Sequence, residues 1–148
     1  MLCPDPREAV AAMFSGEAKI LRSSGFRLGC PVASVALDVA STTETVHKPY
    51  ADVFASWINA PAEGIAASGT PRETATDLAS YILASLEGAT ILSRTSKSVK
   101  PLEQTAQFVL PDGILLEDRA EDRQRRTGNP VCFRRCRDMC INLFNPGP

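Results

Sequence analysis

The stretch Thr70–Thr95, TPRETATDLASYILASLEGATILSRT, has the most regular pattern in the chain and decides the expected fold. Thr70 and Glu73 have the spacing of a capping box, and Pro71 suits the first helical position. Two stripes at helical spacing follow, one apolar and one of mostly small side chains, so the helix is expected to contact protein on two sides. The first stripe contains Leu78, Ile82, Leu86 and Ala89, and the second contains Tyr81, Ser85, Gly88 and Leu92.

Before this helix, the sequence predicts another over residues 6–23. Asp5 can cap the free N–H groups of its first turn. Pro6 suits the first helical position, because the backbone N–H that proline lacks would have no partner there. Gly25 is expected to end the helix. Apolar side chains recur near the 3.6-residue period, and charged side chains lie off that stripe. The stripe contains Val10, Met13, Phe14 and Leu21, whereas Arg7, Glu8, Glu17 and Lys19 lie off it.

Residues 31–40 fit two kinds of secondary structure. Val35, Leu37 and Val39 alternate as in a strand, whereas Val32, Val35, Ala36 and Val39 share one face of a helix. The alanines and the helical neighbours favour the helix.

Residues 41–68 are expected to contain a third helix with two interruptions. Ser41 and Glu44 have capping-box spacing. A proline inside a helix costs about 3 kcal/mol, so we expect a late start near Pro49 and a kink or break near Pro61. A short helix is also expected from Pro101, ending at residues 111–113. The apolar stripe of the third helix contains Tyr50, Val53, Phe54, Trp57, Ile58 and Ile65.

These patterns predict an all-α fold, a bundle of about five helices over residues 5–110. Residues 111–148 are expected to form an irregular, poorly ordered tail rich in arginine and cysteine, with weak periodicity and a break at 128–130.

The composition excludes several classes of protein. Hydrophobic residues make up 44% of the 148 and charged residues 22%, as in a soluble globular domain. The net charge of −1 is not that of a free-standing DNA-binding protein, which would usually be basic. No apolar run approaches the roughly 20 residues that span a bilayer, and no secretory leader is expected. The odd number of cysteines, five, favours reduced thiols and a cytoplasmic location.

Chemical sites are weakly indicated. Cys132, Cys136 and Cys140 would share one side of a helix, but structural zinc needs four ligands, so no metal or other cofactor is expected. Cys30 could be a nucleophile with His47 as its base, but the sequence shows neither a base within reach nor an activating charge. A structural thiol is therefore favoured. The arginine clusters at 123–126 and 134–137 are interleaved with acidic residues and are expected to be solvated. No catalytic residue is assigned, and no enzyme is expected.

Five short segments carry a family resemblance: Asp5–Glu8, Ser24–Val32, Phe54 with Trp57, Leu86–Ala89 and Ser98–Leu102. In this order and spacing they resemble the C-terminal domain of TetR-family transcriptional regulators of the LmrA/YxaF type, over about residues 5–110. The N-terminal helix-turn-helix of that family is not found in this sequence. The tail has no counterpart in the family.

The resemblance implies an all-helical domain that binds a small, mostly apolar effector and forms a homodimer through its last two helices. DNA would be bound only through the missing helix-turn-helix, and no membrane partner is implied. The implied effector site contains Phe14, Leu21, Val35, Val39, Phe54, Trp57, Ile58, Leu83 and Leu86. The implied dimer interface contains Tyr81, Ser85, Gly88, Ala89, Leu92, Leu102, Ala106 and Val109.

Two hypotheses for function remain. The first is the ligand-sensing and dimerisation domain of a TetR-family repressor. The second is a non-enzymatic helical interaction protein that pairs with itself or with a related regulator and binds no effector. An internal cavity beside Trp57 would favour the first, and a filled core with only an exposed apolar face would favour the second.

Overall fold

The computed structural model describes residues 5–109, and these residues form five helices and no strand. The helices are α1 (Pro6–Ser23), α2 (Pro31–Val39), α3 (Glu44–Ala67), α4 (Arg72–Ser96) and α5 (Lys100–Val109). The expected all-α fold of about five helices is confirmed, including the helix over the ambiguous residues 31–40. The tail expected at 111–148 lies outside the described residues.

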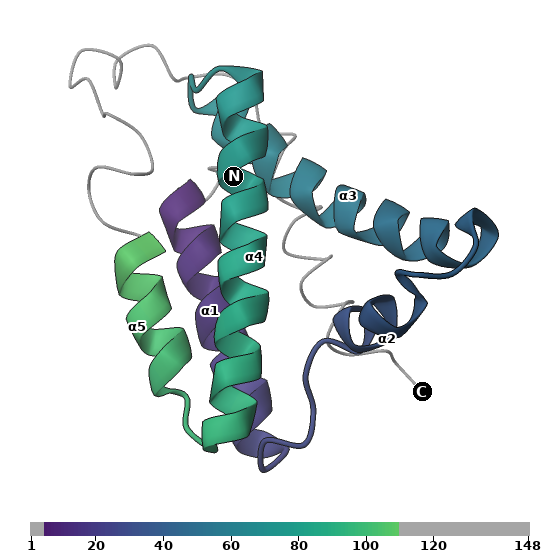
Figure 1. Ribbon diagram of the computed structural model, residues 1–148. Helices are drawn as coiled ribbons and strands as arrows, with labels where there is room; N and C mark the ends of the chain where they lie inside the picture. The colour runs from purple at the N-terminus through teal and green to yellow at the C-terminus, as the bar shows by residue number, and fades with distance from the viewer. Residues whose placement is uncertain (1–4, 110–148) are drawn as a thin grey trace, which may run out of the picture.

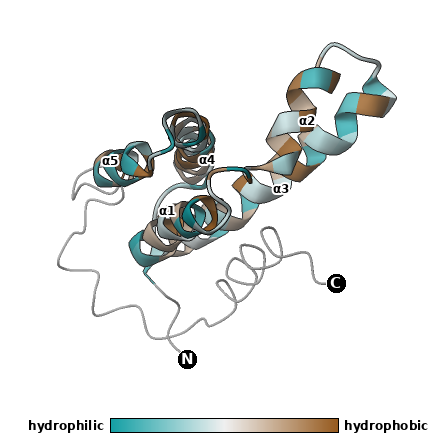
Figure 2. Cartoon of the chain, turned by 90° about the horizontal axis from the view of Figure 1, so that it is seen from below, coloured by the Kyte–Doolittle hydropathy of each residue, from teal (hydrophilic) through white to brown (hydrophobic). Residues whose placement is uncertain are grey.

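The helices form a bundle with a projecting arm (Figure 1). α1, α4 and α5 lie side by side, and each contacts the other two. The C-terminal part of α3 joins this bundle through α4, whereas its N-terminal part extends away and carries α2. Seen from below, α2 and the start of α3 again stand apart from the other three helices (Figure 2). We call α2 together with the first half of α3 the arm.

The core of the bundle takes side chains from four of these helices. The most completely buried apolar side chains include Leu21 of α1, Ile65 of α3, Ile82 of α4 and Leu102 of α5. Burying each side chain of this size contributes about 1.5–3 kcal/mol. By contrast, no residue of α2 is buried. The arm therefore gains little stability from the core.

The helix starts agree only in part with the expected caps. Asp5 caps α1 as predicted, because its Oδ1 accepts a hydrogen bond from the Arg7 backbone N–H at 2.9 Å. The capping box predicted at Thr70–Glu73 is wrong: Pro71 occupies the cap position of α4, and no side chain caps the helix. The box predicted at Ser41–Glu44 is also wrong, since Glu44 is the first residue of α3 and Thr43 precedes it without a capping bond.

The late start near Pro49 and the break near Pro61 expected in α3 are absent, since the helix continues through both prolines. Pro61 is buried with Ala62 and Ile65 on the face that packs into the bundle, and this packing offsets the local cost of the proline. Pro49 has no N–H to donate to the Thr45 carbonyl, which therefore lacks its helical partner. Both residues are exposed, so water can replace that hydrogen bond.

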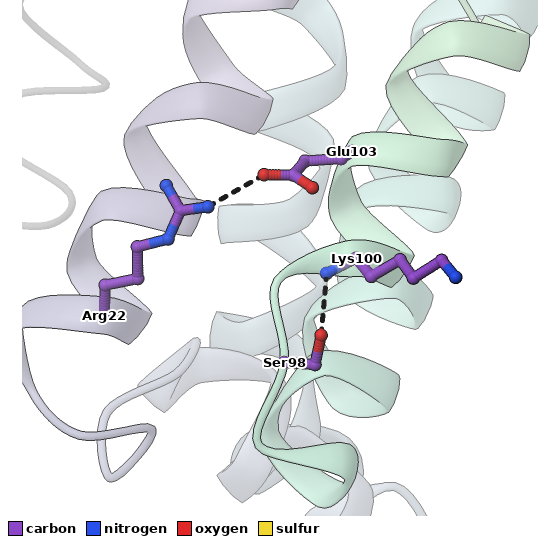
Figure 3. A network of polar contacts seen from close by, with 4 residues as sticks. All are labelled: Arg22, Ser98, Lys100 and Glu103. Carbon is purple, nitrogen blue, oxygen red and sulfur yellow. Dashed lines mark hydrogen bonds and ion pairs between the residues drawn. The ribbon is translucent and has the colours of Figure 1, made fainter.

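α5 is attached mainly by burial. Arg22 of α1 and Glu103 of α5 form an ion pair with an N–O distance of 2.8 Å, and the Ser98 hydroxyl accepts from the Lys100 backbone N–H at 3.2 Å (Figure 3). Both ion-pair side chains are more than half exposed, so the pair contributes little, typically below about 1 kcal/mol. Leu102 and Val109, both buried, hold α5 on the bundle.

Leu21→Ala tests this arrangement. Leu21 is 0% exposed, so the substitution leaves a cavity and should lower the free energy of unfolding by about 2–5 kcal/mol. Leu37→Ala is the control, because Leu37 on α2 is 75% exposed and should change stability by less than about 0.5 kcal/mol. Urea unfolding followed by circular dichroism measures both. Equal effects of the two substitutions would contradict the fold.

Candidate functional site

The predicted effector residues separate into two groups in the structure. Phe14, Leu21 and Leu86 are buried in the bundle core, and Ile58 packs against the same core. On the arm, Val35 is largely exposed and Val39 is half-buried. Leu83 of α4 is half-buried. The bundle group is thus brought together by packing, whereas the α2 residues are left without a buried partner surface.

Phe54 and Trp57 form an aromatic pair on α3. Their ring centroids lie 5.4 Å apart with planes at 87°, an edge-to-face contact of the kind that contributes about 0.5–1.5 kcal/mol beyond burial. Trp57 is buried but stands outside the main core cluster, and Phe54 is half-buried. The pair therefore lies between the bundle end of α3 and the arm.

The predicted dimer residues also divide. Tyr81 and Leu92 are 50% and 59% exposed, Gly88 is exposed, and Ser85 is half-buried. A methyl group at Gly88 would meet no heavy atom within 4 Å, so this surface is open. Four other residues of the set face the protomer's own core, since Ala89, Leu102 and Val109 are buried and Ala106 packs against the core.

Sequence reasoning missed two apolar side chains beside the exposed residues. Ile91 on α4 is 52% exposed, and Phe108 on α5 is 73% exposed. Phe108 lies off the inward stripe of Leu102, Ala106 and Val109, and this position outside the stripe is the signal that could have identified it.

Glu17 is the largest departure from the expected site. It was placed off the apolar stripe of α1, yet the residue is 2% exposed, between Phe14 and Leu21 on the inward face. Its spacing of three from Phe14 and four from Leu21 could have indicated this. Neither carboxylate oxygen has a hydrogen-bond partner.

The surroundings of Glu17 favour its neutral form. Burial, and then the nearby Glu87, raise the pKa of Glu17 to about 7. The Thr90 hydroxyl and the Arg94 charge act in the opposite direction, but neither makes a hydrogen bond with the carboxylate that meets ordinary geometry. Burial also raises the pKa of Glu87, which is half-buried on α4. Glu17 on α1 and Glu87 on α4 are thus both shifted towards their neutral forms.

Cys30 lies at the start of α2. Its sulfur accepts from the Ala33 backbone N–H at 3.3 Å and so caps α2, and Cys30 and Glu87 each influence the pKa of the other. Burial raises the pKa of Cys30 to about 12, so the thiol stays protonated. Among residues 5–109, no hydrogen bond joins Cys30 to His47. Cys30 therefore lacks the thiolate that a nucleophile needs, and its sulfur caps α2 instead.

Arg94 fixes the loop between α1 and α2 onto α4. Its Nη2 donates to the Arg27 carbonyl at 3.2 Å, and its side chain lies against Gly29. A Cβ at Gly29 would lie 2.8 Å from Arg94 Cδ, so a larger residue there would force the Arg94 side chain to shift. The Nε of Arg94 is buried without a partner.

No group of three or more His, Cys, Asp or Glu side chains within residues 5–109 could hold a metal ion. Cys132, Cys136, Cys140 and the two arginine clusters lie outside the described residues. In the described part, no helix is both long and apolar enough to cross a membrane.

Comparison with known proteins identifies the family. The family model described as "Transcriptional regulator LmrA/YxaF-like, C-terminal domain" matches residues 6–108. The chain therefore belongs to the TetR family of transcriptional regulators, and residues 6–108 form its LmrA/YxaF-like C-terminal domain.

The relatives are two proteins of Mycobacterium tuberculosis, one from strain CDC 1551/Oshkosh and one from strain ATCC 25618/H37Rv, each named an uncharacterized HTH-type transcriptional regulator. Each is 31% identical over 101 residues, which cover 65% of this chain and 52% of the relative. The chain thus spans about half the length of these relatives. No solved structure shows a significant match.

The pH dependence of stability tests the environment of Glu17. The folded pKa of about 7 exceeds the unfolded value of 4.5, so the folded state holds the proton more tightly. The stabilisation from this group is present below pH 4.5 and is lost as the pH rises to about 7. Between pH 5 and pH 8 the loss should be about 2–3 kcal/mol.

Glu17→Gln should remove this loss, and the variant should gain stability over the wild type as the pH rises. Urea unfolding of both proteins at both pH values gives the difference. Parallel pH profiles for the two proteins would contradict the burial of an unpartnered carboxyl group.

Proposed function

We propose that residues 5–109 are the effector-binding and dimerisation domain of a transcriptional repressor, which binds a small, mainly apolar molecule and pairs with a second copy. The observation that supports this most directly is the two-sided character of α4. One face is buried in the bundle, and the opposite face is exposed yet uncharged over almost half of the helix.

The exposed face has the properties of an interface between copies. We call it the α4/α5 surface, and it consists of Tyr81, Ala84, Gly88, Ile91, Leu92 and Phe108. The two charged residues of α4 in this stretch, Glu87 and Arg94, are half-buried and face the α1 side. Exposed apolar surface of this kind is costly in water and is typical of an interaction site. The small Ala84 and Gly88 allow a second helix to approach closely.

The arm supports the effector part of the proposal. α2 has apolar side chains, including Val35 and Leu37, that no part of the described chain buries. The aromatic pair Phe54–Trp57 lies on the adjoining helix. An apolar molecule held between the arm and the bundle would cover these side chains, and burial of apolar surface would drive binding.

Action on DNA would be indirect. The relatives are named HTH-type regulators, and this chain matches about half of their length. We propose that pairing through the α4/α5 surface sets the distance between two helix-turn-helix heads, and that the effector changes this distance. For this mechanism the effector needs only to bind more tightly to one arrangement of the paired chains than to the other.

Gly88→Leu tests the interface. The new side chain projects into open space within the protomer, so the fold should be retained, but it should obstruct a partner helix and raise the dimer dissociation constant at least about tenfold. Sedimentation velocity over a concentration series measures this constant.

Gly16→Leu is the matched control. Gly16 lies within α1, and a methyl group there also meets no heavy atom within 4 Å, but the residue is not part of the α4/α5 surface. Its dissociation constant should equal that of the wild type. If Gly88→Leu dimerises as strongly as Gly16→Leu, the interface is elsewhere.

Nile red, a neutral apolar dye, tests effector binding. Saturable binding of about one dye per protomer is expected, and Phe54→Ala should weaken it about threefold to tenfold because an aromatic contact is lost. Val46→Ala, at an exposed position of the same helix, is the control and should bind as the wild type does. A dimer without saturable dye binding would instead support the helical interaction protein.

A further inference from the structure

We propose that one end of the helical bundle is a basic surface that contacts the phosphate backbone of duplex DNA. The proposal rests on the action on DNA proposed above and adds a direct contact from this domain to the contacts of the helix-turn-helix heads. We call this surface the basic end, and it consists of Lys19, Arg22, Arg27, Arg94, Lys97 and Lys100.

The first argument is the clustering of these cations. α1 and α4 end, and α5 begins, at the same end of the bundle (Figure 1). The Nη2 of Arg94 donates to the Arg27 carbonyl at 3.2 Å, which joins the loop after α1 to α4. Arg22 pairs at 2.8 Å with Glu103, one turn after Lys100, which joins α1 to α5. All six cations except Arg94 are exposed, so solvent meets them as one group.

The second argument is the uneven distribution of charge. Residues 5–109 contain nine Lys and Arg side chains against eleven Asp and Glu side chains, and six of the nine cations belong to the basic end. Glu103 offsets one of them, whereas burial raises the pKa values of Glu17 and Glu87 and so weakens their negative charge. Cations within a Debye length of about 8 Å act together in physiological salt. A domain of net negative charge therefore presents one positive end.

The third argument is that helix stability explains only part of the cluster. Cations at a helix C-terminus interact favourably with the helix dipole, which accounts for Arg22 on α1 and Arg94 on α4. Lys100 instead begins α5, where the dipole disfavours a cation. Neither ion pair within residues 5–109 involves Lys97 or Lys100. These two lysines thus keep charges that the described chain does not neutralise.

The arrangement favours an extended polyanion over a small anion. The cations come from three helices and the segments beside them, and Figure 3 shows the Lys100 side chain extending away from Arg22. They therefore do not converge on one point. Duplex DNA carries about one charge per 1.7 Å of its axis, and cations bind it by releasing counterions. Since the two relatives are named HTH-type transcriptional regulators, DNA is the polyanion that fits best.

The salt dependence of DNA binding tests the proposal. Fluorescence anisotropy of a labelled duplex of about 20 base pairs measures the association constant of the full chain between about 20 and 200 mM potassium chloride. Its logarithm should fall linearly with the logarithm of the salt concentration, by about 0.9 for each phosphate neutralised. Lys97→Gln combined with Lys100→Gln should lower this slope by about 1.8 and weaken binding at least about tenfold at the lowest salt.

Lys48→Gln combined with Arg72→Gln is the matched control. It removes the same charge from two exposed positions outside the basic end, one on the arm and one at the start of α4. Its slope and affinity should equal those of the wild type. Equal losses in the two double variants would show an effect of net charge alone and would overturn the basic end.

Three further outcomes are decisive. No duplex binding by the wild type, or binding that Lys97→Gln with Lys100→Gln leaves unchanged, would overturn the proposal. Binding to phosphatidylglycerol vesicles but not to the duplex would assign the basic end to a membrane surface and overturn it as well. The dimer dissociation constant and Nile red binding should be the same in both double variants as in the wild type. Failure of DNA binding alone therefore leaves the proposed sensing and pairing intact, and failure of those two measurements in the wild type would overturn that function instead.

Discussion

The packing of α4 against its neighbours is the constraint on which the rest of the structure depends. α4 contacts α1, α3 and α5, and its inward face alternates alanines such as Ala75, Ala79 and Ala89 with the larger Ile82 and Leu86. The small side chains let the neighbouring helices approach, and the large ones fill the space between them. Since the opposite face of the same helix is the α4/α5 surface, any shift of α4 in the core also moves that surface.

Local sequence patterns were sufficient for the helices themselves. The stripe of Val10, Phe14 and Leu21, the cap at Asp5 and the apolar face of α4 each follow from helix geometry, and the structure has them. The error at Pro61 arose where tertiary packing overrides a local rule. Pro61 should interrupt α3 by its own chemistry, but burial beside Ala62 and Ile65 keeps the helix continuous.

The candidate site was less predictable for the same reason. Whether Ala89 or Leu102 faces a partner or the protomer's own core depends on how the helices are placed, and periodicity alone cannot decide it. Glu17 is the clearest instance, since a glutamate within a helix is ordinarily solvated. Its position between Phe14 and Leu21 was the one sequence feature that indicated burial. The influence of Glu87, seventy residues later in the chain, is a property of the folded state.

The length of α3 has a mechanical consequence. Its 24 residues form a rod about 36 Å long that packs on the bundle from Ile58 to Ile65, whereas its first half projects from it (Figure 1). A rotation of about 5° about Ile58 would move the start of α3, roughly 20 Å away, and α2 with it by about 2 Å. The arm thus amplifies small rearrangements beside α4 into displacements large enough to reposition whatever contacts its tip.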